Sequence, residues 1–295
     1  MSVLRQAALA LLAVLVGLTA VAAALASPSR TVPAGASCAK ADLELVDEGK
    51  LTIGTDNPTY GPWFEGGELK GSKWKGNDPS TGKGFESAVA YAVAKQLGFK
   101  PSEVEWTYVP FNKSFAPGKK SFDFDVNQIS FTPDRAKVVS FSNSYYNVNQ
   151  ALVALKGTQI AKARTIRALR DYKLGAQLGT TSYSYIEKRI RPSQQPAVFD
   201  DNAAAIQQLK NGQIDGIVVD LPTAFYVTAV QVPNGTIVGQ FPSPLGGEHF
   251  GMVFAKGNPL VACVNLALAK LTRAGTLQKL QQQWLAKATG APVLK

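Results

Sequence analysis

From residue 51 onward the chain alternates short apolar stretches with amphipathic ones, and this order constrains its fold more than any other feature. Leu51–Thr55 and Val104–Tyr108 have the length and pattern of strands. Between them, apolar residues recur at the spacing of one helix face over residues 85–97, and Gly98 is a fitting stop. Strands that alternate with helices are typical of parallel sheets covered by helices, so the sequence predicts an α/β protein.

The same alternation continues to the C-terminus. Strands are predicted at residues 122–126, 174–177, 214–219 and 251–255, and helices at residues 182–191, 202–211, 260–271 and 277–284. With 295 residues, the chain is long enough for one large domain or two smaller ones, each with its own core.

The first 26 residues have the composition of a secretory signal peptide. One positive charge, Arg5, precedes a long apolar run that ends in an Ala-Leu-Ala cleavage pattern. An uncleaved anchor is the rival interpretation, because about 20 apolar residues can span a bilayer. We expect cleavage, a flexible tail over residues 27–41, and secretion across the cytoplasmic membrane to a periplasmic or cell-surface location.

Cys38 and Cys263 are the only cysteines. Export places them where disulfides persist, and two cysteines allow a single intramolecular pairing. We therefore predict a Cys38–Cys263 disulfide that ties the N-terminal tail to a C-terminal helix, with two free thiols as the alternative. A lipid anchor on Cys38 is disfavoured, because this residue lies well past the end of the apolar run.

The composition argues against several classes of protein. One histidine and two cysteines make a zinc site of Cys and His ligands implausible, and we expect no metal and no cofactor. The net charge is +10, and +9 without residues 1–26, where Arg5 is the only charged side chain. The basic residues are scattered without interleaved aromatics, so no nucleic-acid partner is expected.

Candidate binding residues follow the ends of predicted strands, where ligands bind in open α/β sheets. Asp56, Tyr60, Trp63 and Phe64 come after the first strand. The aromatic rings can form a flat apolar wall against a ligand, or they can fill the core beneath a loop. The sequence leaves both interpretations open.

Three further strand ends carry charged or hydrogen-bonding residues. Arg135 can hold a carboxylate through two parallel hydrogen bonds. Thr180 and Thr181 precede a predicted helix, whose first N–H groups bind anions, although plain capping by Thr181 or Ser182 explains them equally well. Asp220 suits an ammonium group and also fits as a helix cap. Together these residues predict a site for a zwitterionic amino acid.

Over almost the whole mature chain, the sequence resembles the family-3 solute-binding proteins of bacterial polar amino-acid ABC importers. The matching stretches, in family order, are LTIGTDNPTYGPWF, GKGFESAVAYAVAKQLGF, FDFDVNQISFTPDRAKVVSFSNSYY, LGAQLGTTS, IDGIVVDLPTAFY and GTLQKLQQQWL. The resemblance implies a periplasmic-binding-protein type II fold, in which two Rossmann-like α/β lobes are joined by two hinge strands and enclose the ligand. It places a discontinuous lobe 1 at residues 42–146 plus 250–295, lobe 2 at residues 151–241, and the hinge at residues 147–151 and 242–249.

The resemblance also implies roles for the candidate residues. Three match positions that hold the ligand α-carboxylate: Arg135, Thr180 and Thr181. One matches the position that holds the α-amino group: Asp220. Four match side-chain and aromatic contacts or their neighbours: Asp56, Tyr60, Trp63 and Phe64. Two match further hydrogen-bonding positions of lobe 1: Gln128 and Ser130.

The function that the resemblance implies is transport. We expect a monomer without enzymatic activity that captures a free polar or charged amino acid between closing lobes and delivers it to the membrane permease of an ABC importer. Asp56 favours a basic or amide side chain in the ligand, whereas the positive net charge favours an acidic one. An enzyme on the same scaffold, of dehydratase or cell-wall lyase type, and a ligand-sensing surface protein are the alternatives.

Overall fold

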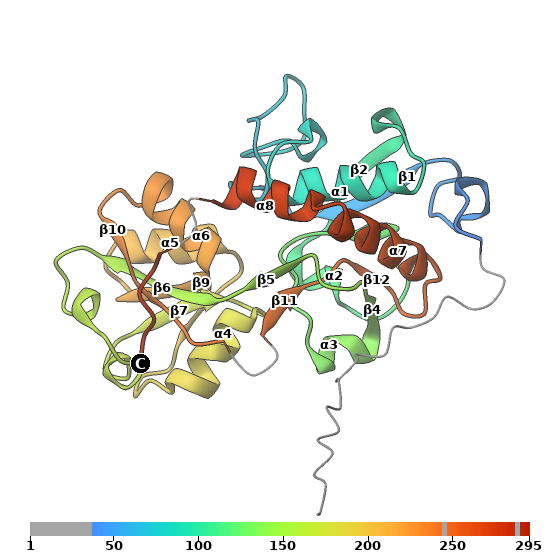
Figure 1. Cartoon of the computed structure of the whole chain (residues 1–295). Helices are drawn as coiled ribbons and strands as arrows, with labels where there is room; N and C mark the ends of the chain where they lie inside the picture. The colour runs from blue at the N-terminus through green and yellow to red at the C-terminus, as the bar shows by residue number, and fades with distance from the viewer. Residues whose placement is uncertain (1–36, 244–246, 287–289) are drawn as a thin grey trace, which may run out of the picture. The chain divides into compact units, whose positions relative to one another are not determined.

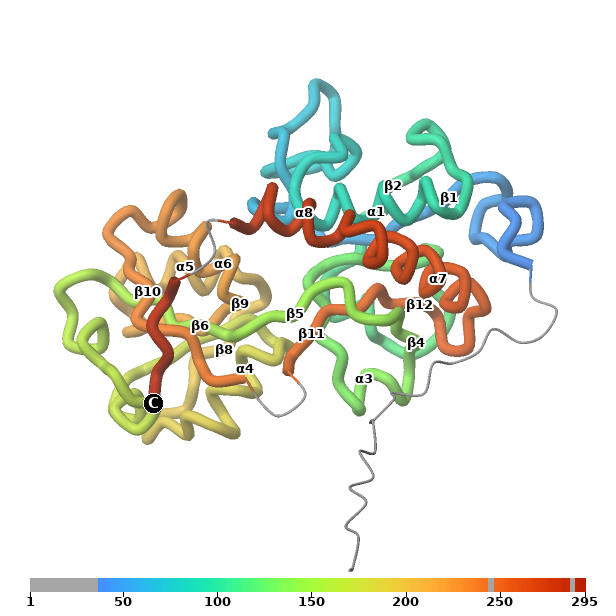
Figure 2. Tube along the Cα trace, in the orientation of Figure 1, coloured from blue at the N-terminus to red at the C-terminus, as the bar shows by residue number. Residues whose placement is uncertain are grey.

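Two five-stranded sheets account for the α/β alternation in the computed structural model, which describes residues 37–243, 247–286 and 290–295 (Figures 1 and 2). Each sheet has its own hydrophobic core. The signal peptide predicted for residues 1–26 lies outside the described residues.

The first sheet belongs to lobe 1 and has the strand order β2-β1-β3-β12-β4. Its strands are β1 (Leu51–Thr55), β2 (Val104–Tyr108), β3 (Phe124–Asp125), β4 (Val139–Phe141) and β12 (Val253–Ala255). Its helices are α1 (Phe85–Gln96), α2 (Phe111–Ser114), α3 (Pro133–Val138), α7 (Leu260–Arg273) and α8 (Thr276–Leu285). Single 3-10 turns lie at Lys40–Asp42, Pro79–Thr81 and Pro101–Glu103.

The second sheet belongs to lobe 2 and has the order β10-β6-β9-β7-β8. Its strands are β6 (Gln150–Leu155), β7 (Leu174–Gln177), β8 (Ala197–Phe199), β9 (Gly216–Asp220) and β10 (Gly235–Gln240). Its helices are α4 (Thr181–Tyr185), α5 (Asn202–Lys210) and α6 (Leu221–Tyr226), of which α4 and α6 continue as π-helical turns Ile186–Ile190 and Val227–Gln231. Two 3-10 turns lie at Ile160–Lys162 and Arg167–Leu169.

Both sheets are mixed, which corrects the expectation of parallel sheets. Strand β12 runs antiparallel to β3 and β4, and β6 runs antiparallel to β9 and β10. These two strands follow directly after the hinge strands β5 and β11, so they enter their sheets without a preceding helix. A strand that runs parallel to the one before it in the same sheet needs a long crossover connection. Strands β6 and β12 enter their sheets from the hinge, so they need no such connection and can run antiparallel to their neighbours.

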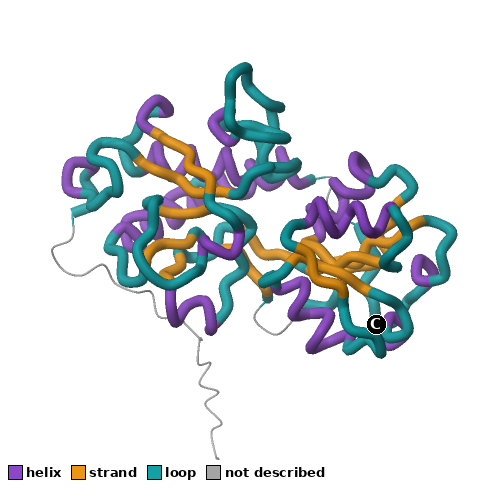
Figure 3. Tube along the Cα trace, turned by 180° about the vertical axis from the view of Figure 1, so that it is seen from behind, coloured by secondary structure: helices purple, strands orange, loops and turns teal. Residues whose placement is uncertain are grey.

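The hinge is an antiparallel pair of short strands, β5 (Tyr146–Val148) and β11 (Glu248–Phe250), which connects the two lobes (Figure 3). The pairing places His249 opposite Asn147. These strands begin or end one residue outside the predicted hinge segments, and Gln150 already belongs to β6.

The last residues of the chain contact lobe 2, whereas lobe 1 is the lobe predicted for them. Leu294 is 1% exposed in the lobe 2 core, and Val293 bridges to Gln240 of the edge strand β10. The carbonyl of Lys295 accepts a hydrogen bond from the backbone N–H of Ile166 at 2.7 Å. An edge strand has unpaired backbone N–H and C=O groups, and the last residues of the chain form hydrogen bonds with those of β10. The apolar side chain of Leu294 packs into the lobe 2 core beside them.

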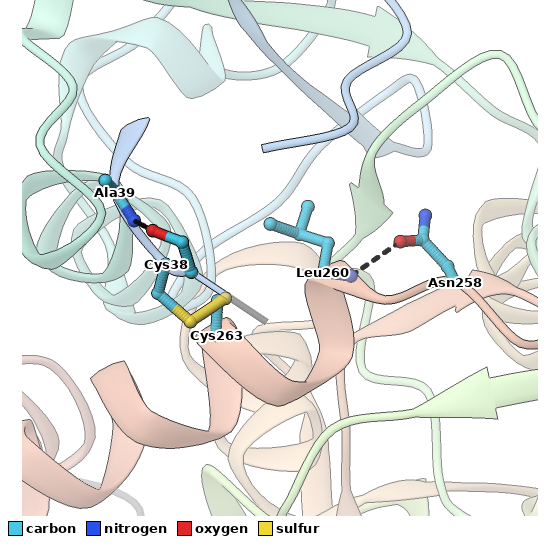
Figure 4. Close-up of a disulfide and its surroundings, with 6 residues drawn as sticks. Cys38, Ala39, Asn258, Leu260 and Cys263 are labelled. Carbon is cyan, nitrogen blue, oxygen red and sulfur yellow. Dashed lines mark hydrogen bonds between the residues drawn. A yellow bond between two sulfur atoms is a disulfide. The ribbon is translucent and has the colours of Figure 1, made fainter. Parts of the chain in front are cut away.

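The predicted disulfide is present and joins Cys38 to Cys263 of α7, with the two Cα atoms 5.5 Å apart (Figure 4). Lys40 next to it pairs with Glu103 at 2.7 Å and lies over the ring of Phe99. Residues 37–41 of the predicted flexible tail are therefore held against lobe 1, and residues 27–36 lie outside the described residues.

Helices α7 and α8 pack on each other and on α1. Their buried side chains, including Leu260, Val264 and Leu268, complete the lobe 1 core. Across the described ranges, no single helix has the length and apolar composition that crossing a membrane requires, and only α7 and α8 taken together, bent by 76°, pass that test.

Candidate functional site

A cavity of about 340 Å³ lies between residues of the two lobes. All ten predicted ligand-binding residues line it: Asp56, Tyr60, Trp63, Phe64, Gln128, Ser130, Arg135, Thr180, Thr181 and Asp220. Six come from the loops after β1 and β3, Arg135 comes from α3, and the other three come from the carboxyl ends of β7 and β9. The predicted residues thus come together although they span much of the chain.

The loop with the aromatic residues is held by the start of α1. The carbonyl groups of Pro62 and Trp63 accept hydrogen bonds from the first helical N–H groups, those of Phe85 and Glu86, both at 2.9 Å. Gly84 precedes the helix with φ +90°, and a Cβ there would lie 2.5 Å from the carbonyl oxygen of Trp63. Only glycine permits this approach, so the helix start fixes where the aromatic loop lies.

The three aromatic residues of this loop have different surroundings. Trp63 and Phe64 are each 2% exposed in the lobe 1 core, where Trp63 packs edge-on against Phe85, Tyr146 and Phe250. The indole N–H of Trp63 also donates to the hydroxyl of Thr223 in lobe 2 at 2.9 Å. Tyr60 is only partly buried. Trp63 and Phe64 therefore pack in the core and also line the edge of the cavity. Tyr60 is the aromatic ring of this loop that is most accessible to a ligand.

Arg135 connects the two lobes. Its Nη1 donates to the carbonyl of Ser130 at 2.6 Å, and its Nη2 donates to the carbonyl of Gly179 at 2.8 Å. The guanidinium lies over the rings of Phe111 and Phe115, with its carbon 5.6 and 4.2 Å from their centroids. Burial lowers its pKa to about 10, against the opposing effect of Glu248 and Asp220, so it stays cationic at neutral pH. A guanidinium has five N–H donors, and those beyond the two bonded ones can serve a ligand carboxylate.

Thr180 is the residue that caps α4. Its hydroxyl accepts from the backbone N–H of Tyr183 at 3.0 Å and donates to the carbonyl of Gln177 at 2.7 Å. The alternative of capping by Thr181 or Ser182 is therefore wrong, because Thr180 is the N-cap residue. Because the side chain of Thr180 accepts the hydrogen bond at the start of α4, the hydroxyl of Thr181 is not needed as a cap. It lies at the cavity, 3.4 Å from the hydroxyl of Ser130.

Asp220 stands at the start of α6 but makes no side-chain capping bond. Its Oδ1 accepts from the side-chain amide of Gln150 at 2.6 Å. Burial raises the pKa of Asp220 well above its ordinary range, and the nearby Glu248 adds to this effect, which Gln150 and Arg135 oppose. A cation placed beside this carboxyl group would stabilise its ionised form against both burial and the charge of Glu248.

Gln128 lines the cavity but is held from behind by Glu86. Its backbone N–H donates to Glu86 at 2.7 Å, its side-chain amide donates to the same carboxyl group, and so does the hydroxyl of Tyr145. Gln128 adopts a left-handed backbone conformation, φ +49°. The side chain predicted to contact the ligand is thus engaged with Glu86, at full burial beneath the cavity.

Replacing Glu86 by Gln is expected to flatten the pH dependence of stability. Burial raises the pKa of Glu86 to about 7 from an ordinary 4.5, although its three donors oppose the shift. The folded protein then keeps a proton that the unfolded chain loses. The free energy of unfolding should therefore be highest below pH 4.5 and fall by about 3 kcal/mol toward pH 7 through this group.

Urea unfolding at pH 4.5 and pH 7 measures this difference. Glu44→Gln makes the same chemical change at an exposed position of lobe 1 and should keep the wild-type slope. An unchanged slope in Glu86→Gln would show that Glu86 titrates like a solvent-exposed glutamate.

Several lining or supporting residues were not predicted from the sequence. They are Phe111, Asn127, Gln150, Asp200, Asp201, Tyr226 and Glu248. Phe111 follows β2, a strand that the sequence does predict, so the strand-end search could have found it. Asp200 and Asp201 follow β8, which was not among the predicted strands. Gln150 and Glu248 belong to β6 and the hinge strand β11, where no strand-end rule applies.

The part of the cavity beside Asp56 is acidic. Burial raises the pKa of Asp56, and the charge of Asp201 adds to the shift. Burial likewise raises the pKa of Tyr60, again with contributions from Asp201 and Asp56. Among the described residues, four aspartates and a single basic residue, Arg135, line the cavity. Its electrostatics therefore favour a ligand with more positive than negative charge.

Comparison with known proteins places the chain in a family. Residues 72–287 match the family described as bacterial extracellular solute-binding proteins, family 3. The chain belongs to this family. The predicted resemblance is thereby confirmed, over a match that covers most of both lobes.

Relatives of known name are binding proteins for amino acids. The chain is 29% identical to the ABC transporter arginine-binding protein 1 of Escherichia coli, over 68% of this chain and 81% of that protein. It is 28% identical to the L-cystine-binding protein TcyJ of Escherichia coli, over 85% and 87%.

Solved structures support the same family assignment. An ancestral arginine-binding protein bound to glutamine superposes with a TM-score of 0.67 and 30% identity, over 81% of this chain and 98% of that one. An ancestral protein named as a precursor of cyclohexadienyl dehydratase gives a TM-score of 0.65 and 29% identity, over 80% and 95%. The predicted type II fold is confirmed.

Proposed function

We propose that this protein is secreted, captures a free amino acid in the cavity between its lobes, and delivers it to the permease of an ABC importer. The observation that carries the proposal is the arrangement of Arg135 and Asp220 on one cavity. Arg135 offers free N–H groups to an α-carboxylate, and Asp220 offers a carboxyl group that capping leaves free to an α-amino group. Thr181 and Ser130 supply hydroxyl groups near them.

Hinge closure is the mechanism that fits these contacts. Arg135 bonds to lobe 2 through Gly179, and Trp63 bonds to lobe 2 through Thr223. A ligand that touches residues of both lobes favours the closed arrangement, because its contacts are complete only there.

We further infer that the ligand has a cationic side chain. Asp56 and Asp201 lie close enough to affect each other's charge, and they approach the cavity from different lobes. With the α-carboxylate on Arg135 and the α-amino group on Asp220, these carboxylates remain for the side chain. The names of the arginine-binding relatives support the same class of ligand.

A thermal-shift screen of the natural amino acids tests this function. Arginine and lysine are expected to raise the melting temperature most, since a ligand at 100 times its Kd adds about 2.7 kcal/mol of stability. Asp56→Asn should reduce the preference for these two over glutamine, whereas the exposed Asp171→Asn should leave it unchanged. A screen led by glutamate and aspartate would reverse the side-chain assignment, and a screen with no responding amino acid would remove the function.

Catalysis is the second candidate. The ancestral relative of a dehydratase and the closeness of Asp220 to Glu248 favour it. Against it, the only histidine, His249, stacks on Phe131 at 5.4 Å and is not among the residues that line the cavity. We infer capture without chemistry, for which the bound amino acid must be recovered unchanged after prolonged incubation.

A further inference from the structure

A hydrogen-bonded network behind the cavity converges on Glu248. Its Oε1 accepts from the hydroxyl of Ser130 at 2.5 Å and from the side-chain amide of Gln150 at 3.1 Å. The same amide nitrogen donates to Asp220 at 2.6 Å. The carbonyl oxygen of Gln150 in turn accepts from the hydroxyl of Ser182 at 2.6 Å. Glu248 thus links a loop of lobe 1, the hinge and a strand of lobe 2.

The direction of these hydrogen bonds follows from the number of hydrogens available. A serine hydroxyl has one hydrogen, and Ser130 donates it to Glu248, so its oxygen can only accept from anything else. The two amide hydrogens of Gln150 go to Asp220 and Glu248 by the two short contacts. At the cavity, Asp220 and Ser130 are therefore left as hydrogen-bond acceptors.

A primary ammonium group fits such a set of acceptors. It has three donors and no acceptor, so it complements two acceptor side chains on the same cavity wall, whereas a hydroxyl group supplies one donor. Glu248 itself is not among the residues that line the cavity. It acts through Ser130 and Gln150, which it keeps oriented. The charged groups close to this network are Arg135, Asp220 and, through Asp220, Glu86.

We propose that Glu248 is a positioning residue that makes this end of the cavity accept hydrogen bonds only, and so selects ligands with a free α-amino group. The proposal rests on the proposed function, because it assumes an amino acid in the cavity. A plain structural role for Glu248 as a hinge contact is the competing explanation. The two explanations predict different selectivity between ligands with and without an α-amino group. Loss of a plain hinge contact would weaken binding of all ligands alike, whereas loss of a positioning residue would weaken mainly those with the amino group.

Calorimetric titration of Glu248→Leu with L-arginine and with its α-hydroxy analogue, argininic acid, separates them. Leucine has a similar volume but accepts no hydrogen bond. The hydroxyl of Ser130 and one amide hydrogen of Gln150 therefore lose their acceptor and become free to donate toward the cavity. Binding of L-arginine should weaken about 10- to 100-fold and binding of argininic acid less than about 3-fold. Glu44→Leu makes the same change at an exposed position and should alter neither affinity.

Equal weakening of both ligands in Glu248→Leu, or no weakening, overturns the proposal while the proposed function stands. If the wild-type protein binds no natural amino acid, the proposed function fails, and this proposal with it. Ser130→Ala guards against a variant that does not fold, because it removes only one buried oxygen and leaves Glu248 in place. It should show the same preferential loss of L-arginine, and equal weakening of both ligands there also contradicts the proposal.

Discussion

Arg135→Ala is expected to weaken binding of the amino-acid ligand by about 2–5 kcal/mol, the usual cost of leaving one member of a buried charge pair without its partner. The guanidinium is buried, contacts two phenylalanine rings, and donates to carbonyl groups of both lobes. Its removal deprives the ligand carboxylate of a charged donor and also removes a bond that closes the lobes. Isothermal titration calorimetry with L-arginine measures the change.

Arg135→Lys is the matched control for charge. Lysine keeps a cation but has no planar fork, so it cannot serve Ser130, Gly179 and a ligand carboxylate together. We expect an affinity between those of wild type and Arg135→Ala. Wild-type affinity in Arg135→Ala would contradict the assigned role, provided that the melting temperatures of the free proteins agree.

Removal of the disulfide, by Cys38→Ser together with Cys263→Ala, is expected to lower the free energy of unfolding by about 5 kcal/mol. The bond closes a loop of 225 residues, and the entropy that such a loop removes from the unfolded chain grows with its length. Alanine suits position 263 because Cys263 is 4% exposed among apolar side chains of α7 and its neighbours.

Urea unfolding of oxidised, reduced and doubly substituted protein tests this expectation. The reduced protein should unfold at the midpoint of the double variant, and the Kd for L-arginine should stay the same because neither cysteine lines the cavity. Equal midpoints for all three forms would show that the bond contributes nothing to stability.

The loop after β1 illustrates how far sequence patterns reach. Its composition predicted an aromatic wall and a core plug equally well, and each alternative holds for part of it. Trp63 and Phe64 enter the core, while Tyr60 stays partly exposed at the cavity. Local sequence records which residues are apolar, but burial depends on which distant elements pack against them, here Phe250 and Trp106.

Strand direction and the end of the chain show the same limit. The period of apolar residues located β1, α1 and β7 closely, because that period is a local property. It carried no information about β6 and β12 running antiparallel, or about Leu294 docking in lobe 2. Those features depend on the hinge, which brings segments far apart in sequence together.

The sequence alone determined the α/β alternation, the single possible disulfide and the residue types that suit a zwitterion. These features depend on composition and on the spacing of residues that are close together in the chain. Only the tertiary structure decided that Asp220 does not cap its helix, that Gln128 is held by Glu86, and that Glu248 stands behind Ser130 and Gln150. The physical reason is that hydrogen-bond partners are chosen by distance in space. Glu248 and Ser130 are 118 residues apart in the chain and 2.5 Å apart in the fold.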